Sequence, residues 1–204
     1  MSHEKRSVFA KARFIKSCYG VQDFPPDDGS EILFLGRSNA GKSTLINALC
    51  HQKSLARVSK TPGRTQCLNV FEFSDKAFLV DAPGYGFAKV RQAMLADWQA
   101  TVKRYCKKRK SLSQVVLIMD MRHPLQSNDR EWIDELLVCG VADRLVLVLS
   151  KLDKLTRKEQ QKNLHVVLNY LQAITCPQIS VFPLSAKSGV GMEALTQSLL
   201  ASIF

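Results

Sequence analysis

The stretch Gly36-Arg37-Ser38-Asn39-Ala40-Gly41-Lys42-Ser43 has the complete G-x-x-x-x-G-K-S pattern of a phosphate-binding loop. The short apolar run 31–35 before it predicts a buried strand, and residues 44–49 after it open a helix with an apolar face. The two glycines let the backbone bend around a polyphosphate, toward which the helix N-terminus points its N–H groups. Lys42 is then placed to reach the β- and γ-phosphates, and the Ser43 hydroxyl to bind Mg²⁺. The alternative is a chance glycine-rich turn, which the flanking strand and helix disfavour.

The composition is that of one globular domain. The chain has 204 residues, of which 46% are hydrophobic and 23% charged, enough apolar material for a sizeable core. No apolar run approaches the ~20 residues that span a bilayer, so we expect no membrane segment. The six cysteines show no C-x-x-C pairing, which favours reduced thiols over a disulfide framework or a zinc site. Reduced thiols favour the cytoplasm, and we expect a monomer.

The chain is strongly basic, with a formal net charge of +11. A domain of this charge is attracted to polyanions, of which nucleic acid is the commonest. The alternative is a solvated basic surface that binds nothing in particular. The densest group of cations falls at the end of a predicted helix and consists of Lys103, Arg104, Lys107, Lys108, Arg109 and Lys110.

Apolar patterning divides the chain into a basic N-terminal arm and loop, residues 1–28, and a single domain, residues 29–204. The arm has no apolar stretch of the secretory kind. Predicted strands cover 31–35, 66–73, 77–80, 115–119, 145–149 and 179–184, and predicted helices follow from 44 and over 92–108, 129–139, 158–174 and 192–204. This alternation predicts a doubly wound, three-layer α/β domain. Its six-stranded sheet is mostly parallel, with one antiparallel strand from the hairpin at 74–76.

Polar motifs follow three of these strands at their carboxyl ends, where such folds bind ligands. Asp81-Ala82-Pro83-Gly84 brings a carboxylate near the metal and a glycine N–H near the γ-phosphate. Ser150-Lys151-Leu152-Asp153 ends in a carboxylate that can accept two parallel hydrogen bonds from guanine but not from adenine. Ser185-Ala186-Lys187 can offer a backbone N–H to guanine O6. Each motif alone is weak, because it also occurs in solvated turns, but their order after a phosphate-binding loop predicts binding of GTP and GDP.

The sequence resembles the TrmE–Era–EngA–EngB–septin superfamily of GTPases and, within it, the EngB (YsxC or YihA) family. The resemblance is carried by the phosphate-binding loop with Thr44 and by Thr61-Pro62-Gly63-Arg64-Thr65-Gln66, Asp81-Ala82-Pro83-Gly84-Tyr85-Gly86 and Asp120-Met121-Arg122-His123-Pro124. It runs from about Phe14 to the C-terminus. It implies a P-loop GTPase domain that assists assembly of the large ribosomal subunit through its rRNA and is needed for normal cell division and septation.

The resemblance also implies roles for particular residues. Ser43 and Thr65 would be the direct Mg²⁺ ligands, and Lys42, Thr65 and Gly84 would act in hydrolysis. A first switch would consist of Gly63, Arg64, Thr65, Gln66 and Cys67, ordered by the γ-phosphate and the metal. Asn39 occupies the position at which relatives in the superfamily hold K⁺, although it could equally serve only to shape the loop.

Two positions depart from what GTPases usually carry. Position 150 is Ser, where the family usually has Thr and GTPases at large have Asn; Ser keeps a hydroxyl but not an amide that can bridge at both ends. The residue after Gly84 is Tyr85, where Ras-like enzymes place a water-orienting Gln. A phenol is a poor base at neutral pH, so we expect slow intrinsic turnover. Arg64 could stabilise charge in cis, or equally contact phosphate or RNA.

Two classes of function stay open on these grounds. In the first, the protein is an enzyme whose GTP hydrolysis times its release from an assembling ribosomal particle. In the second, it is a nucleotide-gated division regulator or RNA-binding module in which hydrolysis is incidental. The basic helix end favours an RNA partner, whereas the missing Gln slightly favours the second class.

Overall fold

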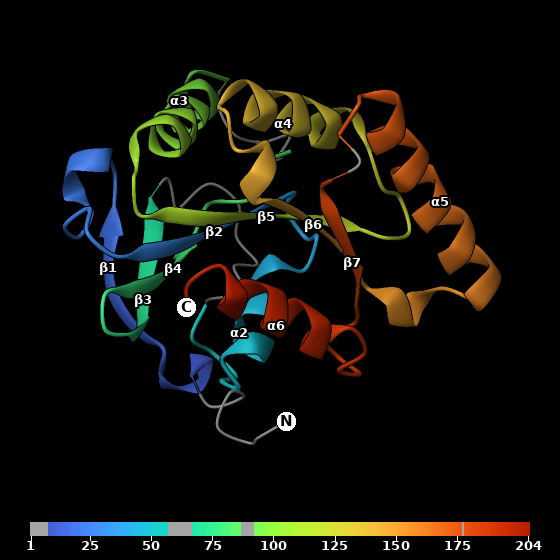
Figure 1. Cartoon of the computed structure of the whole chain (residues 1–204), viewed down its shortest axis with the longest axis horizontal. Helices are drawn as coiled ribbons and strands as arrows, with labels where there is room; N and C mark the ends of the chain where they lie inside the picture. Colours follow the sequence, from blue (N-terminus) through green and yellow to red (C-terminus); the bar gives the residue numbers. More distant parts are fainter. Residues whose placement is uncertain (1–7, 57–66, 87–91, 177) are drawn as a thin grey trace.

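The computed structural model describes residues 8–56, 67–86, 92–176 and 178–204, with only the backbone of 92–96 (Figure 1). Within these residues, five α-helices and four 3-10 helices precede, separate or follow the strands of a single sheet. In chain order the elements are η1 (Phe9–Lys11), β1 (Arg13–Cys18), η2 (Val21–Asp23), β2 (Ser30–Gly36), α2 (Lys42–Leu49), β3 (Leu68–Ser74), β4 (Ala77–Asp81), α3 (Gln92–Lys108), β5 (Leu112–Asp120), α4 (Ser127–Val138), η3 (Ala142–Arg144), β6 (Leu145–Ser150), η4 (Leu152–Lys154), α5 (Arg157–Ala173), β7 (Ser180–Pro183) and α6 (Met192–Ala201).

The sheet has the strand order β1-β3-β4-β2-β5-β6-β7. Strands β4, β2, β5, β6 and β7 pair in parallel, and β3 pairs antiparallel with both β4 and β1. The predicted α/β class and the single antiparallel strand are therefore confirmed. The predicted strand count of six is wrong, because the sheet described here has seven strands.

The additional strand, β1, lies within the segment predicted as a basic arm. Its residues are mostly exposed, so its apolar side chains show no buried alternation from which a strand could be predicted. It is held instead by backbone pairing with β3 and by Arg13, whose Nε donates to Glu72 Oε2 at 3.0 Å. Backbone pairing to an open sheet edge does not depend on side-chain hydrophobicity, which is why the sequence pattern missed it.

Helices cover both faces of the sheet, which makes the predicted three layers (Figure 1). Leu33 and Leu35 of β2 pack in a core with α3, α4 and α5, while Ile32 and Phe34 pack in a second core with α2 and α6. A strand buried on both faces reads as a continuous apolar run, as 31–35 does. The parallel strands all end at one edge of the sheet, and the predicted site residues follow them there.

Candidate functional site

The loop between β2 and α2 is shaped by glycines at two positions, for two different reasons. A side chain at Gly36 would place its Cβ 2.8 Å from the backbone oxygen of Ile118 in β5, so only glycine fits between the strands. Gly41 has a φ of +99°, a left-handed conformation that glycine adopts without strain. Ala40 N donates to Arg37 O at 2.9 Å, which closes a turn within the loop just before α2 begins.

The loop after β4 is joined to the phosphate-binding loop. Lys42 and Asp81 are both buried and form an ion pair, which brings the first residue of α2 to the end of β4. Ser38 N donates to Tyr85 O at 2.8 Å, and Tyr85 N to Gly36 O at 3.2 Å. A Cβ on Gly84 would lie 3.0 Å from Ser38 Cα, so this glycine is needed for the close approach of the two loops.

Tyr85 is turned into the core. Its ring is stacked on Trp132 with centroids 5.8 Å apart, and its hydroxyl is 2.8 Å from Asp129 Oδ1. Burial, together with the nearby Asp129 carboxylate, raises the pKa of the Tyr85 phenol far above its usual value. Burial also raises the pKa of Asp129. Tyr85 therefore packs the loop onto α4 and stays uncharged, so it cannot serve as a base.

The end of β6 is also tied to the phosphate-binding loop. Ser150 Oγ lies within hydrogen-bonding distance of Ala40 O and of Met119 O, the latter at 3.1 Å. One hydroxyl has one proton, so it satisfies one of these carbonyls at a time. Lys151 has a φ of +61°, and its Nζ donates to Asn39 O at 2.6 Å.

The motifs predicted to recognise the base lie side by side. Asp153 Oδ1 accepts a hydrogen bond from Ser185 Oγ at 2.7 Å, and this bond lowers the pKa of the exposed Asp153 carboxyl. Ser185 N donates to Val190 O at 2.9 Å and is not available to a ligand. Within the part of the chain that the structure describes, the N–H groups of Ala186 and Lys187 have no protein partner. The arrangement thus presents a carboxylate and backbone donors together.

A polar cluster around Asp120, to which the sequence motif alone assigns no role, lies beside the phosphate-binding loop. Asp120, at the end of β5, accepts from Lys151 Nζ at 2.8 Å and from Arg122 Nη2 at 2.7 Å. Burial alone would raise the pKa of Asp120, but these hydrogen bonds outweigh it and hold the pKa well below its usual value. The cluster borders a cavity of about 260 Å³ that Arg37, His123 and the phosphate-binding loop also line. Its place after a parallel strand is the signal that could have found it.

Part of the predicted first switch is outside the described residues, namely Gly63, Arg64, Thr65 and Gln66. Cys67, the last of that group, is buried with its Sγ 3.8 Å from Asn69 Oδ1. Among the described residues no group of three or more His, Cys, Asp or Glu side chains could hold a metal ion. A metal here would therefore rely on hydroxyl and phosphate oxygens. None of the described helices has the length and apolar character needed to cross a membrane.

A phosphate-binding loop between β2 and α2, with Asp153 after β6 and Ser185 after β7, defines a P-loop GTP-binding domain. The profile of the family described as 50S ribosome-binding GTPase matches residues 31–172. The chain is 43% identical over 186 residues to the probable GTP-binding protein EngB of Stenotrophomonas maltophilia, covering 91% of this chain and 92% of that protein. It is 45% identical over 193 residues to the corresponding protein of Shewanella amazonensis, covering 93% and 88%. The chain belongs to the EngB family of GTP-binding proteins.

Solved structures agree on the fold. The crystal structure of a probable GTP-binding protein EngB is 21% identical, has a TM-score of 0.65 and covers 85% of this chain and 98% of its own. Era in complex with MgGDPNP and a 16S ribosomal RNA fragment is 19% identical, with a TM-score of 0.63, and covers 86% and 57%. At these identities the likeness supports the three-layer GTPase fold alone.

Proposed function

We propose that this protein hydrolyses GTP to GDP and phosphate, and that its GTP-bound form acts in the cytoplasm, as a monomer, in assembly of the large ribosomal subunit. A role in normal cell division and septation would follow from that activity. The observation that carries the proposal is the match of residues 31–172 to a family described by its binding to the 50S particle. The net charge of +11 supports an rRNA partner.

The proposed nucleotide contacts follow the geometry of the sheet edge. The loop from Gly36 to Ser43 would hold the phosphates, with Lys42 exchanging its contact with Asp81 for the β- and γ-phosphates. Asp153 would select guanine, supported by the backbone N–H groups after Ser185. Ser150, Lys151 and Leu152 would hold this base-recognition loop against the phosphate-binding loop.

Mg²⁺ fits the donors that the site offers. Mg²⁺ is usually bound by one or two protein oxygens together with substrate phosphates and water, which a hydroxyl-bearing site can supply. The half-buried Ser43, at the start of α2, would be one ligand and Thr65 the other, with the Asp81 carboxylate nearby. When bound, the metal would neutralise charge on the phosphates, while Lys42 and the N–H group of Gly84 would orient them.

Slow intrinsic hydrolysis is part of the proposal. Ras-like enzymes orient the attacking water with a side chain at the position that Tyr85 occupies here, and Tyr85 is buried against Trp132. The same observation favours the second candidate function, a nucleotide-gated division regulator or RNA-binding module in which hydrolysis is incidental. An activator on the ribosomal particle would favour the first.

The experiment is co-sedimentation with 50S particles in GDP or in a non-hydrolysable GTP analogue, combined with GTP turnover with and without those particles. We expect tighter binding with the analogue, because a switch ordered by the γ-phosphate would add contacts with the particle at the nucleotide edge. We also expect faster turnover with particles than without. The assembly-factor proposal would be refuted if the affinity for 50S particles were the same with GDP and with the analogue and if particles did not change GTP turnover. The division-regulator function would then remain.

A further inference from the structure

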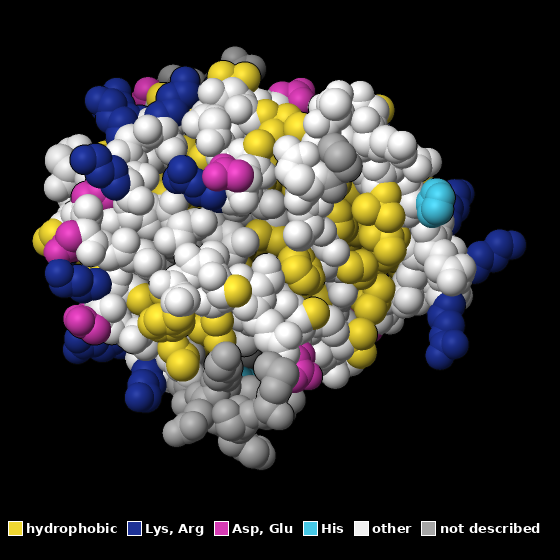
Figure 2. All heavy atoms as spheres, viewed as in Figure 1, with side chains coloured by type: hydrophobic (Ala, Val, Ile, Leu, Met, Phe, Trp, Pro, Cys, Tyr) yellow, Lys and Arg dark blue, Asp and Glu magenta, His cyan; other side chains and the backbone are white. Residues whose placement is uncertain are grey.

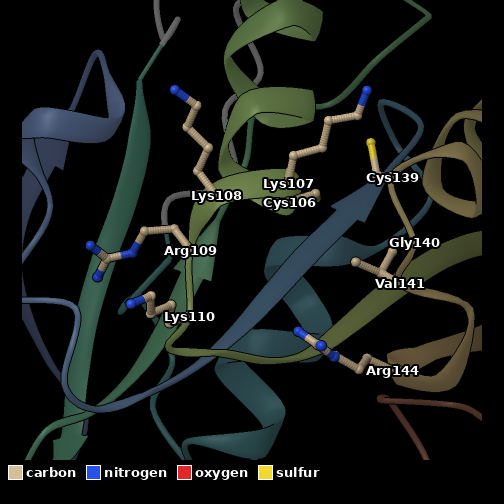
Figure 3. A pocket seen from close by; sticks show the side chains of 9 residues that line it. All are labelled: Cys106, Lys107, Lys108, Arg109, Lys110, Cys139, Gly140, Val141 and Arg144. Atoms are coloured by element: carbon tan, nitrogen blue, oxygen red, sulfur yellow. The ribbon is translucent and has the colours of Figure 1, made fainter.

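A second cavity lies at the edge of the sheet opposite the phosphate-binding loop. It has a volume of about 450 Å³ and opens between the end of α3, the turn into β5 and the connection from α4 to β6. Five of the residues that line it are Lys or Arg (Figure 3), and further Lys and Arg side chains lie on the side of the molecule that carries α3 (Figure 2). We call it the basic cavity, and its cations are Lys107, Lys108, Arg109, Lys110 and Arg144.

Three of these cations are free to meet a ligand. Lys107, Lys108 and Lys110 are exposed, and none forms an ion pair within the described residues. Arg144 stands on the opposite wall, where its Nη1 donates to Leu112 O at 3.1 Å. Its Nε is 3.6 Å from Asp143 Oδ2, a weak exposed pair. The three free lysines therefore extend in different directions from the end of α3 and the turn after it, and Arg144 lies on a separate element (Figure 3).

Arg109 differs from its neighbours, because it is committed to the fold. Its side chain is buried, its Nε is 3.1 Å from Glu31 Oε2, and its Nη2 donates to Pro25 O at 3.0 Å. Its Nε also lies 3.5 Å from Asp27 Oδ1. In Figure 3 its guanidinium extends away from Arg144. It holds the turn that presents Lys108 and Lys110 in a fixed position.

Apart from Asp143, two carboxylates near the cavity are engaged elsewhere. Asp27 accepts from the backbone N–H of Lys110 at 3.1 Å and of Ser111 at 2.8 Å, and Glu135 pairs with Lys103. Lysines in the last turn of a helix stabilise it through its dipole, which is an alternative explanation for Lys107 and Lys108. That explanation does not apply to Lys110 or Arg144, which lie outside α3. Among the described residues, Lys107, Lys108 and Lys110 therefore remain without an ion pair beside the cavity.

We propose that the basic cavity binds the phosphate backbone of structured RNA. The inference that this RNA is ribosomal rests on the proposed function. Structured RNA is met mainly through its phosphates and shape, which suits lysines on a rigid turn. A membrane surface fits less well, because Val138 is the one exposed large apolar side chain of the described residues that adjoins the cavity in sequence. Because the phosphate-binding loop lies at the other edge of the sheet, RNA in the basic cavity and nucleotide in its own site can be bound at the same time.

The test compares two variants of equal charge. In the first, Lys107, Lys108 and Lys110 are replaced by Ala, and Arg109 is kept because it is structural. In the control, Arg157, Lys158 and Lys162, exposed cations of α5, are replaced by Ala. Binding of each protein to a 20-base-pair RNA duplex and to 50S particles is measured across a salt series. Vesicles of phosphatidylglycerol serve as a second polyanion, and GDP affinity reports an intact fold.

We expect the cavity variant to bind RNA and particles at least tenfold more weakly than wild type, and the control less than threefold. The slope of log affinity against log salt should fall by about one for each lysine that contacts a phosphate. Substitution of the same three lysines by Arg should preserve binding. Equal losses in the two Ala variants, with wild type binding particles normally, would overturn the inference but leave the proposed function intact. Binding of the wild-type protein to vesicles but not to RNA would also overturn the inference. Failure of the wild-type protein to bind 50S particles would overturn both the inference and the proposed function.

Discussion

Replacement of Arg109 by Ala should destabilise the protein strongly without touching the nucleotide site. The substitution removes every polar contact that Arg109 makes with Glu31, which is 0% exposed and would keep only the Tyr105 hydroxyl as a partner. It also removes the guanidinium that lies 5.4 Å from the centre of the Phe24 ring. A single charge left buried by loss of its partner costs about 3–5 kcal/mol.

The magnitude converts into a measurable shift in melting temperature. Unfolding entropy is about 2.1 cal/mol/K per residue, which for 204 residues gives roughly 0.43 kcal/mol/K. Arg109→Ala should therefore lower Tm by about 7–12 °C in differential scanning calorimetry. The exposed neighbour Lys108 is the control, since Lys108→Ala should change stability by no more than about 0.5 kcal/mol.

A double variant separates loss of a buried pair from loss of side-chain volume. Arg109→Met with Glu31→Gln removes both charges and keeps an acceptor for the Tyr105 hydroxyl, so it should recover half or more of the stability lost in Arg109→Ala. GDP affinity should stay at the wild-type value in both variants, because this network lies at the edge of the sheet opposite Gly36. A fall in Tm of less than about 2 °C for Arg109→Ala, or no recovery in the double variant, would refute the reasoning.

Three further predictions concern the nucleotide edge. Asp153→Asn should weaken binding of GTP and strengthen binding of XTP in competition experiments, since the new amide matches the C2 carbonyl of xanthine. A preference of the wild-type protein for ATP would contradict the guanine assignment. If Asn39 holds K⁺, hydrolysis should be faster in K⁺ than in Na⁺ at matched ionic strength, and Asn39→Ala should abolish the difference; equal wild-type rates would remove the idea. Asp120 has a lowered pKa in the folded protein, so its ion pairs stabilise the fold above its ordinary pKa of about 3.9 and are lost as pH falls through the lower, folded value. Asp120→Asn should thus be less stable than wild type in urea at pH 7, with the gap narrowing below about pH 4; a gap independent of pH would show that Asp120 acts through shape alone.

Side-chain patterning predicted the elements that are buried on both faces. The runs at 31–35, 115–119 and 145–149 all lie within strands of the structure, namely β2, β5 and β6. Helix ends were less accurate. The last helix ends at Ala201, three residues before its predicted end. The helix predicted from 158 begins at Arg157, where Thr156 and Glu159 form a capping box.

Local motifs do not report how distant charges pair. Residues 107–110 are four cations in a row, and nothing in the row distinguishes Arg109 from its neighbours. The distinction arises because β2 runs beside β5 and brings Glu31 next to the end of α3. Tyr85 is a similar case. The motif places it after Gly84, but only the packing of α4 against that loop turns it toward Asp129 and Trp132.

The phosphate-binding loop, the strand-end motifs and the resemblance to the family can all be identified from the sequence, because each is contained in a few neighbouring residues. Tertiary structure alone decided that β1 joins the sheet, that Ser150 reaches the carbonyl of Ala40, and which cations line the basic cavity. These features depend on groups far apart in the chain, and their distances are set by packing of the helices on the sheet. The hydrophobic pattern predicts which face of a helix or strand is buried. The hydrogen-bonding partner of a polar side chain is fixed only when the helices and strands have packed against one another.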